Sequence, residues 1–208
     1  MTSILYFHGF ASSPGSAKIA ALRPLLEPHG IELNAPDLNV PSFERLDFDA
    51  VVAHAVAEGR RRPPRALVGS SLGALVALAV AKSAFPLPLV LIAPALGVAN
   101  RWREKLPDGD PVTVFNYARN ADAQIHRFFF EQMTRLQVDV TPPPARVTAI
   151  MGREDETVPF AMVEARWREW EQSGDLAPGS QLIVIEKGGH ALVDQAPLIE
   201  AAIVEAVR

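Results

Sequence analysis

The sequence predicts an α/β fold in which a mostly parallel sheet of about six strands is flanked by helices. Short apolar runs alternate along the chain with longer segments whose apolar residues recur at helical spacing. Neighbouring parallel strands need a long crossover between them, usually a helix, and this alternation supplies one. With 208 residues, of which 49% are hydrophobic, the chain can form a single domain with a sizeable core.

The expected strands are the apolar runs, and the expected helices are the amphipathic segments between them. The strands are expected at residues 4–7, 31–35, 66–68, 89–93, 146–151 and 181–185. The helices are expected at residues 16–29, 48–61, 72–84, 159–172 and 198–207.

Apolar spacing and start or stop signals support these helices. In the first helix, Ile19, Leu22 and Leu26 share one face, and Gly30 is a suitable stop. Pro159 suits the first turn of the fourth helix, because a backbone N–H is not needed at that position.

Residues 97–145 break the alternation and are predicted to form a short, cap-like helical insertion within one domain that spans residues 1–208. A single helix is expected there over residues 123–136. The segment is rich in aromatic residues, including Trp102, Tyr117 and Phe128. Two interpretations are open. The aromatic side chains line an acyl pocket, with Phe128 as a candidate substrate contact, or they pack the insertion onto the body.

Composition and charge argue against several classes of partner. The formal net charge is −4, and the one basic cluster, residues 60–62, is interpreted as a solvated loop, so no nucleic-acid surface is expected. The chain has no cysteine, which excludes disulfide and thiol chemistry and is consistent with a cytoplasmic location. No signal peptide is predicted, and prolines break the apolar stretch at residues 72–98, so no membrane span is expected.

The most informative motif is Gly69-Ser70-Ser71-Leu72-Gly73, which lies between an expected strand and an expected helix. This is the G-x-S-x-G pattern of a nucleophile elbow, a sharp turn that exposes its central serine. Glycine suits both flanking positions because strand and helix approach each other closely there. Ser71 is therefore the candidate nucleophile, although a serine hydroxyl needs a base and an orienting acid to act as one.

A second motif, His8-Gly9-Phe10, follows the first expected strand. In enzymes with a nucleophile elbow, such a turn supplies one backbone N–H of the oxyanion hole, and the residue after the nucleophile supplies the other. The N–H groups of Phe10, with Ala11 as the alternative, and of Leu72 are the candidate donors. Leu72 also begins a helix, whose dipole favours negative charge. His8 is interpreted as a structural residue rather than as the base.

The candidate acid and base follow the last two expected strands. Asp155 lies in the turn after the fifth strand, with Glu154 and Glu156 as alternatives, and His190 lies after the sixth. Asp155 is expected to hold the His190 imidazole in the correct tautomer, and His190 to accept the Ser71 proton. Because the carboxyl ends of parallel strands meet at one edge of a sheet, these side chains are expected to converge.

Other residues near this edge have both functional and structural interpretations. Ser12, with Ser13, Ser16 and Lys18, is expected near the oxyanion loop, either as a substrate contact or, for the serines, as a cap of the first helix. Asp37 is interpreted as a residue that organises its loop. The remaining histidines are interpreted as surface or packing residues: His29, His54 and His126.

On these motifs the sequence resembles the α/β-hydrolase superfamily along nearly its whole length. Residues 6–18 are similar to the H-G-F-x-S-S-P-x-S-x-K opening of the small bacterial YqiA-type esterases, which also carry G-S-S-L-G and a late histidine, matching Ser71 and His190. The resemblance implies a minimal α/β-hydrolase fold that lacks the first strands of the full fold. It also implies hydrolysis of carboxylic esters.

The sequence therefore predicts a serine esterase that acts on a small-molecule ester through an acyl-enzyme intermediate. The catalytic set is Ser71, Asp155 and His190, and it requires no metal or cofactor. The same set serves thioesterases and acyltransferases, which stay as alternatives. A non-catalytic ligand-binding module is a further alternative, since the helix that begins at Leu72 could bind an anion.

Overall fold

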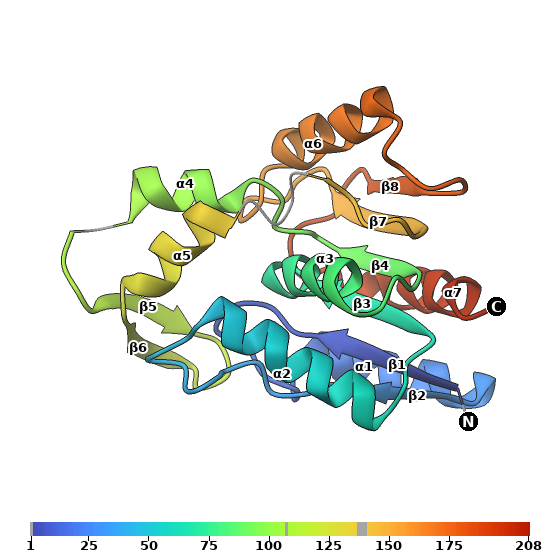
Figure 1. Ribbon diagram of the computed structural model, residues 1–208, viewed down its shortest axis with the longest axis horizontal. Helices are drawn as coiled ribbons and strands as arrows, with labels where there is room; N and C mark the ends of the chain where they lie inside the picture. The colour runs from blue at the N-terminus through green and yellow to red at the C-terminus, as the bar shows by residue number, and fades with distance from the viewer. Residues whose placement is uncertain (1, 107, 137–140) are drawn as a thin grey trace.

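The structure, a computed structural model, describes residues 2–106, 108–136 and 141–208. Its centre is a six-stranded sheet with the strand order β2-β1-β3-β4-β7-β8, in which all neighbours are parallel (Figure 1). The strands are β1 (Thr2–Phe7), β2 (Ile31–Asn34), β3 (Ala66–Ser70), β4 (Leu89–Ile92), β7 (Val147–Gly152) and β8 (Gln181–Ile185). The predicted α/β fold is confirmed, and the predicted strand bounds differ from these by at most two residues.

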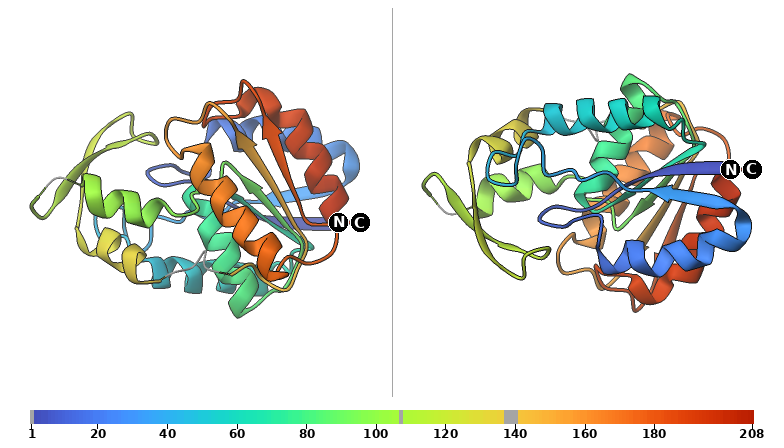
Figure 2. Two further views of the ribbon diagram at one scale, coloured as in Figure 1. Left: turned by 90° about the horizontal axis from the view of Figure 1, so that it is seen from above. Right: turned by 90° about the horizontal axis from the view of Figure 1, so that it is seen from below.

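Helices cover both faces of this sheet (Figure 2). On one face lie α1 (Ala17–Leu26) and α7 (Ala196–Ala206), which pack against each other. On the other face lie α2 (Phe48–Arg61), α3 (Leu72–Ser83) and α6 (Phe160–Ser173). Two short 3₁₀ turns extend the layer of α1 and α7: η1 (Glu27–His29) follows α1, and η2 (Val193–Gln195) precedes α7.

Cover on both faces buries the strands, which is why their sequences are continuously apolar rather than alternating. Residues 4–7 of β1 are all 0% exposed. The central helix α3 packs on β1, β3 and β4 and is buried along nearly its whole length, which accounts for the scarcity of charge over residues 72–98. In the part of the chain that the structure describes, no helix has both the length and the apolar character needed to cross a membrane.

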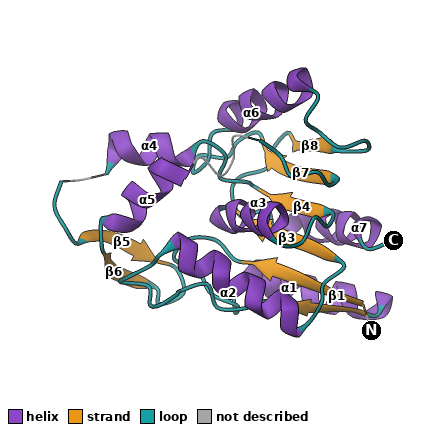
Figure 3. Cartoon of the chain, in the orientation of Figure 1, coloured by secondary structure: helices purple, strands orange, loops and turns teal. Residues whose placement is uncertain are grey.

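The chain between β4 and β7 differs from the helical insertion that the sequence predicts (Figure 3). It comprises α4 (Val98–Lys105), an antiparallel ribbon of β5 (Val112–Asn116) and β6 (Ala121–Ile125), and α5 (Phe128–Leu136). The helix predicted over residues 123–136 is wrong at its start, because cross-strand pairing with β5 overrides the weak helical preference of a short segment. Residues 107 and 137–140 of the predicted insertion lie outside the described residues.

Aromatic side chains pack the insertion against the body. Phe129 and Phe130 of α5 are buried, and the Phe129 ring stacks on the Phe10 ring with centroids 5.7 Å apart. Trp102 of α4 meets the Phe130 ring edge-on at 5.2 Å. The Phe10 ring centroid also lies 5.8 Å from that of Phe43. For these residues, the interpretation of the aromatic segment as packing agrees with the structure.

A buried amide also ties the insertion to the body. Gln132 of α5 is 4% exposed, and its Oε1 accepts the N–H of Phe48, the first residue of α2, at 2.7 Å. Its Nε2 donates to Asp47 Oδ1 and to Asp49 Oδ2, each at 3.1 Å. Asp47 in turn caps α2 by accepting the Ala50 N–H at 3.0 Å. One side chain thus completes the start of α2 and fixes α5 against it.

Replacing Gln132 by Leu should lower the free energy of unfolding by about 1–3 kcal/mol, because the buried Phe48 N–H loses its acceptor. Urea unfolding followed by circular dichroism measures the change. Gln124→Leu is the matched control, since Gln124 is exposed on β6, and it should stay within about 0.5 kcal/mol of the parent. Equal midpoints for Gln132→Leu and the parent protein would contradict this role of the amide.

Candidate active site

Ser71 stands at the turn between β3 and α3 in a conformation that L-residues rarely adopt. Its φ is 55° and its ψ is −118°, and such strain persists only where the surroundings fix it. Its N–H donates to the Ile92 carbonyl oxygen at 2.9 Å, and its own carbonyl oxygen accepts the N–H groups of Ala74 at 3.0 Å and Ala95 at 3.2 Å. The turn is therefore held by β4, by the loop after β4 and by its own helix.

The two glycines of the elbow allow strand and helix to meet. A Cβ at Gly73 would lie 2.6 Å from the His8 carbonyl oxygen and closer still to that of Phe7. A Cβ at Gly69 would lie 2.6 Å from Ala74 Cα. Neither position has room for a side chain, so the close approach inferred from the motif is present in the structure.

His190 and Asp155, from the loops after β8 and β7, form a hydrogen-bonded pair. His190 Nδ1 lies 2.7 Å from Asp155 Oδ2. Asp155 is 5% exposed, and its Oδ1 accepts the N–H groups of Thr157 at 2.9 Å and Val158 at 2.8 Å. These contacts turn the second carboxylate oxygen toward the imidazole, where it accepts the Nδ1–H. With the proton on Nδ1, Nε2 of His190 is an acceptor.

Backbone contacts hold the two loops side by side. The N–H of Arg153 donates to the Ile185 carbonyl oxygen, and that of Glu154 to the Gly188 carbonyl oxygen, both at 2.9 Å. A Cβ at Gly152 would lie 2.5 Å from the Gly188 carbonyl carbon. A glycine at the end of β7 therefore lets the loop of the acid touch the loop of the base.

His8 holds the loop after β1 in place, in agreement with its interpretation as a structural residue. Its buried ring donates from Nδ1 to the Gly9 carbonyl oxygen at 2.9 Å and accepts the Leu38 N–H at Nε2 at 3.0 Å. Burial lowers the pKa of His8 by more than its bonds to Gly9 and Asp37 raise it, so the ring stays neutral. Asp37 organises its own loop by accepting the Asn39 N–H at 3.0 Å.

The same loop brings Phe10, one of the two candidate oxyanion donors, to the elbow. A Cβ at Gly9 would lie only 3.3 Å from Ser71 Cβ. Phe10 is the next residue after this contact in the chain. Leu72 is the first residue of α3, where N–H groups have no acceptor within the helix. Phe10, Leu72 and Ser71 line one cavity.

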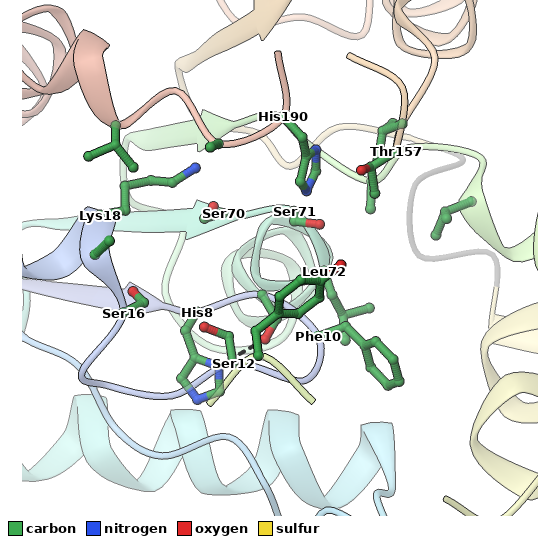
Figure 4. Close-up of a pocket in the computed structure, with 18 of the residues that line it drawn as sticks. His8, Phe10, Ser12, Ser16, Lys18, Ser70, Ser71, Leu72, Thr157 and His190 are labelled. Atoms are coloured by element: carbon green, nitrogen blue, oxygen red, sulfur yellow. Dashed lines mark hydrogen bonds between the residues drawn. The ribbon is translucent and has the colours of Figure 1, made fainter. Parts of the chain in front are cut away.

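This cavity has a volume of about 690 Å³ and lies at the carboxyl edge of the sheet (Figure 4). Ser71 and His190 both line it, and the His190 imidazole points toward Ser71. Asp155 supports His190 from outside the lining. Ser12, a predicted substrate contact, does line the cavity. Across the described residues, no group of three or more histidine, aspartate or glutamate side chains could hold a metal ion.

Phe128, the other predicted substrate contact, does not line the cavity. Its side chain is 47% exposed, and its ring centroid lies 5.9 Å from the Arg135 guanidinium carbon. The insertion contributes Val98, Trp102 and Tyr117 instead. The aromatic composition pointed to the right segment, but which ring faces the cavity depends on how α5 packs against α4 and α2, a contact between distant segments.

Three polar residues of the cavity have roles that the sequence motifs leave open. Lys18 extends into it from α1, beside Ser16. Among the described residues, the Ser16 side chain makes no capping hydrogen bond to α1, so Ser16 does not cap this helix through its side chain. Tyr6 of β1 and Arg101 of α4 also line it and were not predicted. A tyrosine within an apolar strand gave no signal of a polar site.

Lys18 carries its charge into a partly buried position. Burial lowers the pKa of Lys18 to about 8, and the charge of Asp155 raises it by less. Within the described residues, no carboxylate forms an ion pair with its ammonium. A cation held in this way costs stability in the folded state unless a ligand supplies its partner.

Comparison with known proteins identifies the family and the fold. The family model described as "Uncharacterised protein family (UPF0227)" matches residues 3–204, so the chain belongs to this family. Its structure is similar to that of Est1E from Butyrivibrio proteoclasticus with ferulic acid bound, at a TM-score of 0.78 and 16% identity, covering 100% of this chain and 90% of that chain.

Two further solved structures agree. Alpha/beta hydrolase domain-containing protein 10 from mouse has a TM-score of 0.75 at 20% identity, covering 98% of this chain and 88% of that chain. The esterase domain of a Rhodothermus marinus protein has a TM-score of 0.74 at 18% identity, covering 100% of this chain and 88% of that chain. These similarities confirm the fold that the sequence predicts: the chain has the α/β-hydrolase fold.

Lys18→Met should raise the free energy of unfolding at pH 7 by about 1 kcal/mol, because the folded state no longer holds a partly buried ammonium. Between the folded pKa of about 8 and the ordinary 10.5, the folded parent binds fewer protons than the unfolded chain. Its stability therefore rises with pH in this interval, and the advantage of the variant shrinks.

Urea unfolding at pH 7 and pH 10 measures both effects of Lys18→Met. Lys187→Met is the control, because Lys187 is exposed and its replacement should give no such pH-dependent difference. An advantage of Lys18→Met that grows toward pH 10 would show that burial of the ammonium is not the cause.

Proposed function

We propose that this member of family UPF0227 is a serine hydrolase that cleaves carboxylic esters through an acyl-enzyme intermediate. The observation that carries the proposal is the His190–Asp155 pair, whose imidazole points toward Ser71 on the strained elbow. Structures of similar fold that are named as an esterase domain and as a hydrolase domain-containing protein give additional support.

In the first half of the proposed reaction, Ser71 Oγ attacks the ester carbonyl carbon while His190 Nε2 takes the hydroxyl proton. A tetrahedral intermediate forms, with negative charge on the former carbonyl oxygen. The N–H groups of Phe10 and Leu72 donate to that oxygen, and the dipole of α3 favours the charge there. One such donor typically contributes about 10²–10³-fold in rate.

The intermediate collapses when the bond from carbon to the alcohol oxygen breaks. His190 gives its Nε2 proton to the departing oxygen, and the acyl group stays on Ser71. A water molecule then passes a proton to Nε2 and attacks the acyl carbon. The second intermediate releases the carboxylic acid, and the proton returns to Ser71 Oγ. One water molecule is consumed, and the chain is restored.

Asp155 acts through His190 and does not take its proton. Because Thr157 and Val158 occupy one carboxylate oxygen, the other stays directed at His190 Nδ1. The fixed negative charge stabilises the imidazolium that forms in each half of the reaction.

The insertion supplies the apolar wall of the cavity, which supports an acyl or alkyl group as what binds there. Val98 and Trp102 of α4 line this wall, together with Leu72 of the elbow. Trp102 is fixed by the edge-on contact with Phe130. In this proposal the insertion is a cap-like element within one domain that spans residues 1–208.

Ser71→Ala and His190→Ala should each lower kcat for p-nitrophenyl butyrate by at least about 10⁴-fold, because members of such a set act as a unit. Release of p-nitrophenolate measures the rate, and circular dichroism verifies that each variant is folded. Ser83→Ala is the matched control, since Ser83 is an exposed serine at the far end of the same helix, α3, and it should keep the parent rate.

Acyl-CoA thioesters and alcohol acceptors, assayed beside the ester, separate the related activities that use the same residues. If a thioester is turned over faster than every oxygen ester, the proposed substrate is a thioester and not an ester. A clean Ser71→Ala preparation that keeps the parent rate would overturn the proposal.

A further inference from the structure

The cavity beside Ser71 has a polar side that the proposed reaction does not use. The insertion supplies most of the apolar side and also Arg101 of α4, whereas the other polar groups come from α1 and from β1 and β3. The side chains on this polar side include Tyr6, Ser16, Lys18 and Ser70. Figure 4 shows the Lys18 side chain extending its ammonium into this side, in the direction of Ser70.

The charge on the cavity wall is positive. Lys18 and Arg101 both line it, and among the described residues no aspartate or glutamate side chain does. Arg101 donates to the Thr157 carbonyl oxygen at 2.9 Å, and this acceptor carries no charge. Asp155 lies outside the lining, with one carboxylate oxygen bound to His190 and the other to backbone N–H groups.

Two hydroxyl groups, those of Tyr6 and Ser70, lie on the same side of the cavity. Tyr6 is 0% exposed, and its buried hydroxyl lies next to that of Ser70. Burial raises the pKa of Tyr6 by more than the neighbouring Ser70 hydroxyl lowers it, so the phenol keeps its proton. Ser70 lines the cavity, so its hydroxyl is the one that a bound group can reach.

We propose that this polar side binds an anionic group carried by the ester substrate, with the Lys18 ammonium as its counter-charge and the Ser70 hydroxyl as a hydrogen-bond donor. This inference rests on the proposed function and adds the class of substrate. The ester has a small anion, such as a carboxylate, on one side of the scissile bond and an apolar group on the other. Its carbonyl lies between the two walls, at Ser71.

The alternative role of Lys18 is to act on the His190–Asp155 pair through its charge, since it interacts electrostatically with Asp155. Removing the ammonium would then change the turnover of every ester alike. The ratio of kcat/KM between a charged ester and its uncharged isostere cancels such a common effect. It reports only what the polar side does to the anion.

Two matched pairs of esters give this ratio. Monomethyl succinate and methyl 4-methylpentanoate carry a carboxylate or an isopropyl group on the acyl side. Acetoxyacetate and isobutyl acetate differ in the same way on the alcohol side. Turnover is followed by pH-stat titration at pH 7, where Lys18, with a pKa of about 8, is mostly protonated. The parent is compared with Lys18→Met, Lys18→Arg and Lys187→Met.

The parent enzyme should favour the charged ester of at least one pair by roughly 10–100-fold, the range expected for a hydrogen bond to a charged group. Lys18→Met should abolish that preference, and Lys18→Arg should keep part of it because the charge remains. Lys187→Met should keep all of it, since Lys187 is exposed and does not line the cavity.

Equal kcat/KM within both pairs for the parent would overturn this inference and leave the proposed function standing. A charge preference that survives in Lys18→Met would overturn it as well, because the anion would then be bound elsewhere. If the parent hydrolyses none of the four esters and no p-nitrophenyl ester, the proposed function fails, and this inference fails with it.

Discussion

The close approach of β3 and α3 at the elbow is the constraint on which the rest of the site depends. Gly69 and Gly73 leave no side chains where strand and helix meet, and this contact sets the strained backbone of Ser71. The loop after β1 packs against the same turn through Gly9. Because β7 and β8 run parallel to β3 in one sheet, their carboxyl ends bring Asp155 and His190 to the same edge.

The parts of the fold and site that depend on local chemistry could be predicted from the sequence. A serine between two glycines after an apolar strand, followed by an acid and a histidine after later strands, needs only the rule that parallel strands end at one edge. The rest depends on contacts between distant segments. Residues 121–125 form a strand because they pair with β5, and Phe128 is exposed because α5 buries the neighbouring Phe129 and Phe130 instead. Tyr6 lies within an apolar strand, and only the folded structure shows that it borders the cavity.

The two walls of the cavity have different mechanical supports. The wall with Ser71 and His190 is part of the sheet edge, where backbone hydrogen bonds hold the turn after β3 and the loops after β7 and β8. The apolar wall belongs to the insertion, which the Phe10 and Phe129 rings and the Gln132 amide hold in place. Changes in the insertion can therefore alter the apolar wall without disturbing the elbow. A rigid scaffold that carries a variable binding segment is a common arrangement in enzymes.

Activation of Ser71 by the His190–Asp155 pair is tested most directly by covalent labelling with a fluorophosphonate. Such a probe reacts with a serine whose hydroxyl is activated by an adjacent base, and mass spectrometry of peptides locates the adduct. We predict a stoichiometric adduct on Ser71 in the parent protein, formed far more slowly in His190→Ala. A folded parent protein that stays unlabelled, or that is labelled at another serine while Ser71 stays free, would contradict the prediction.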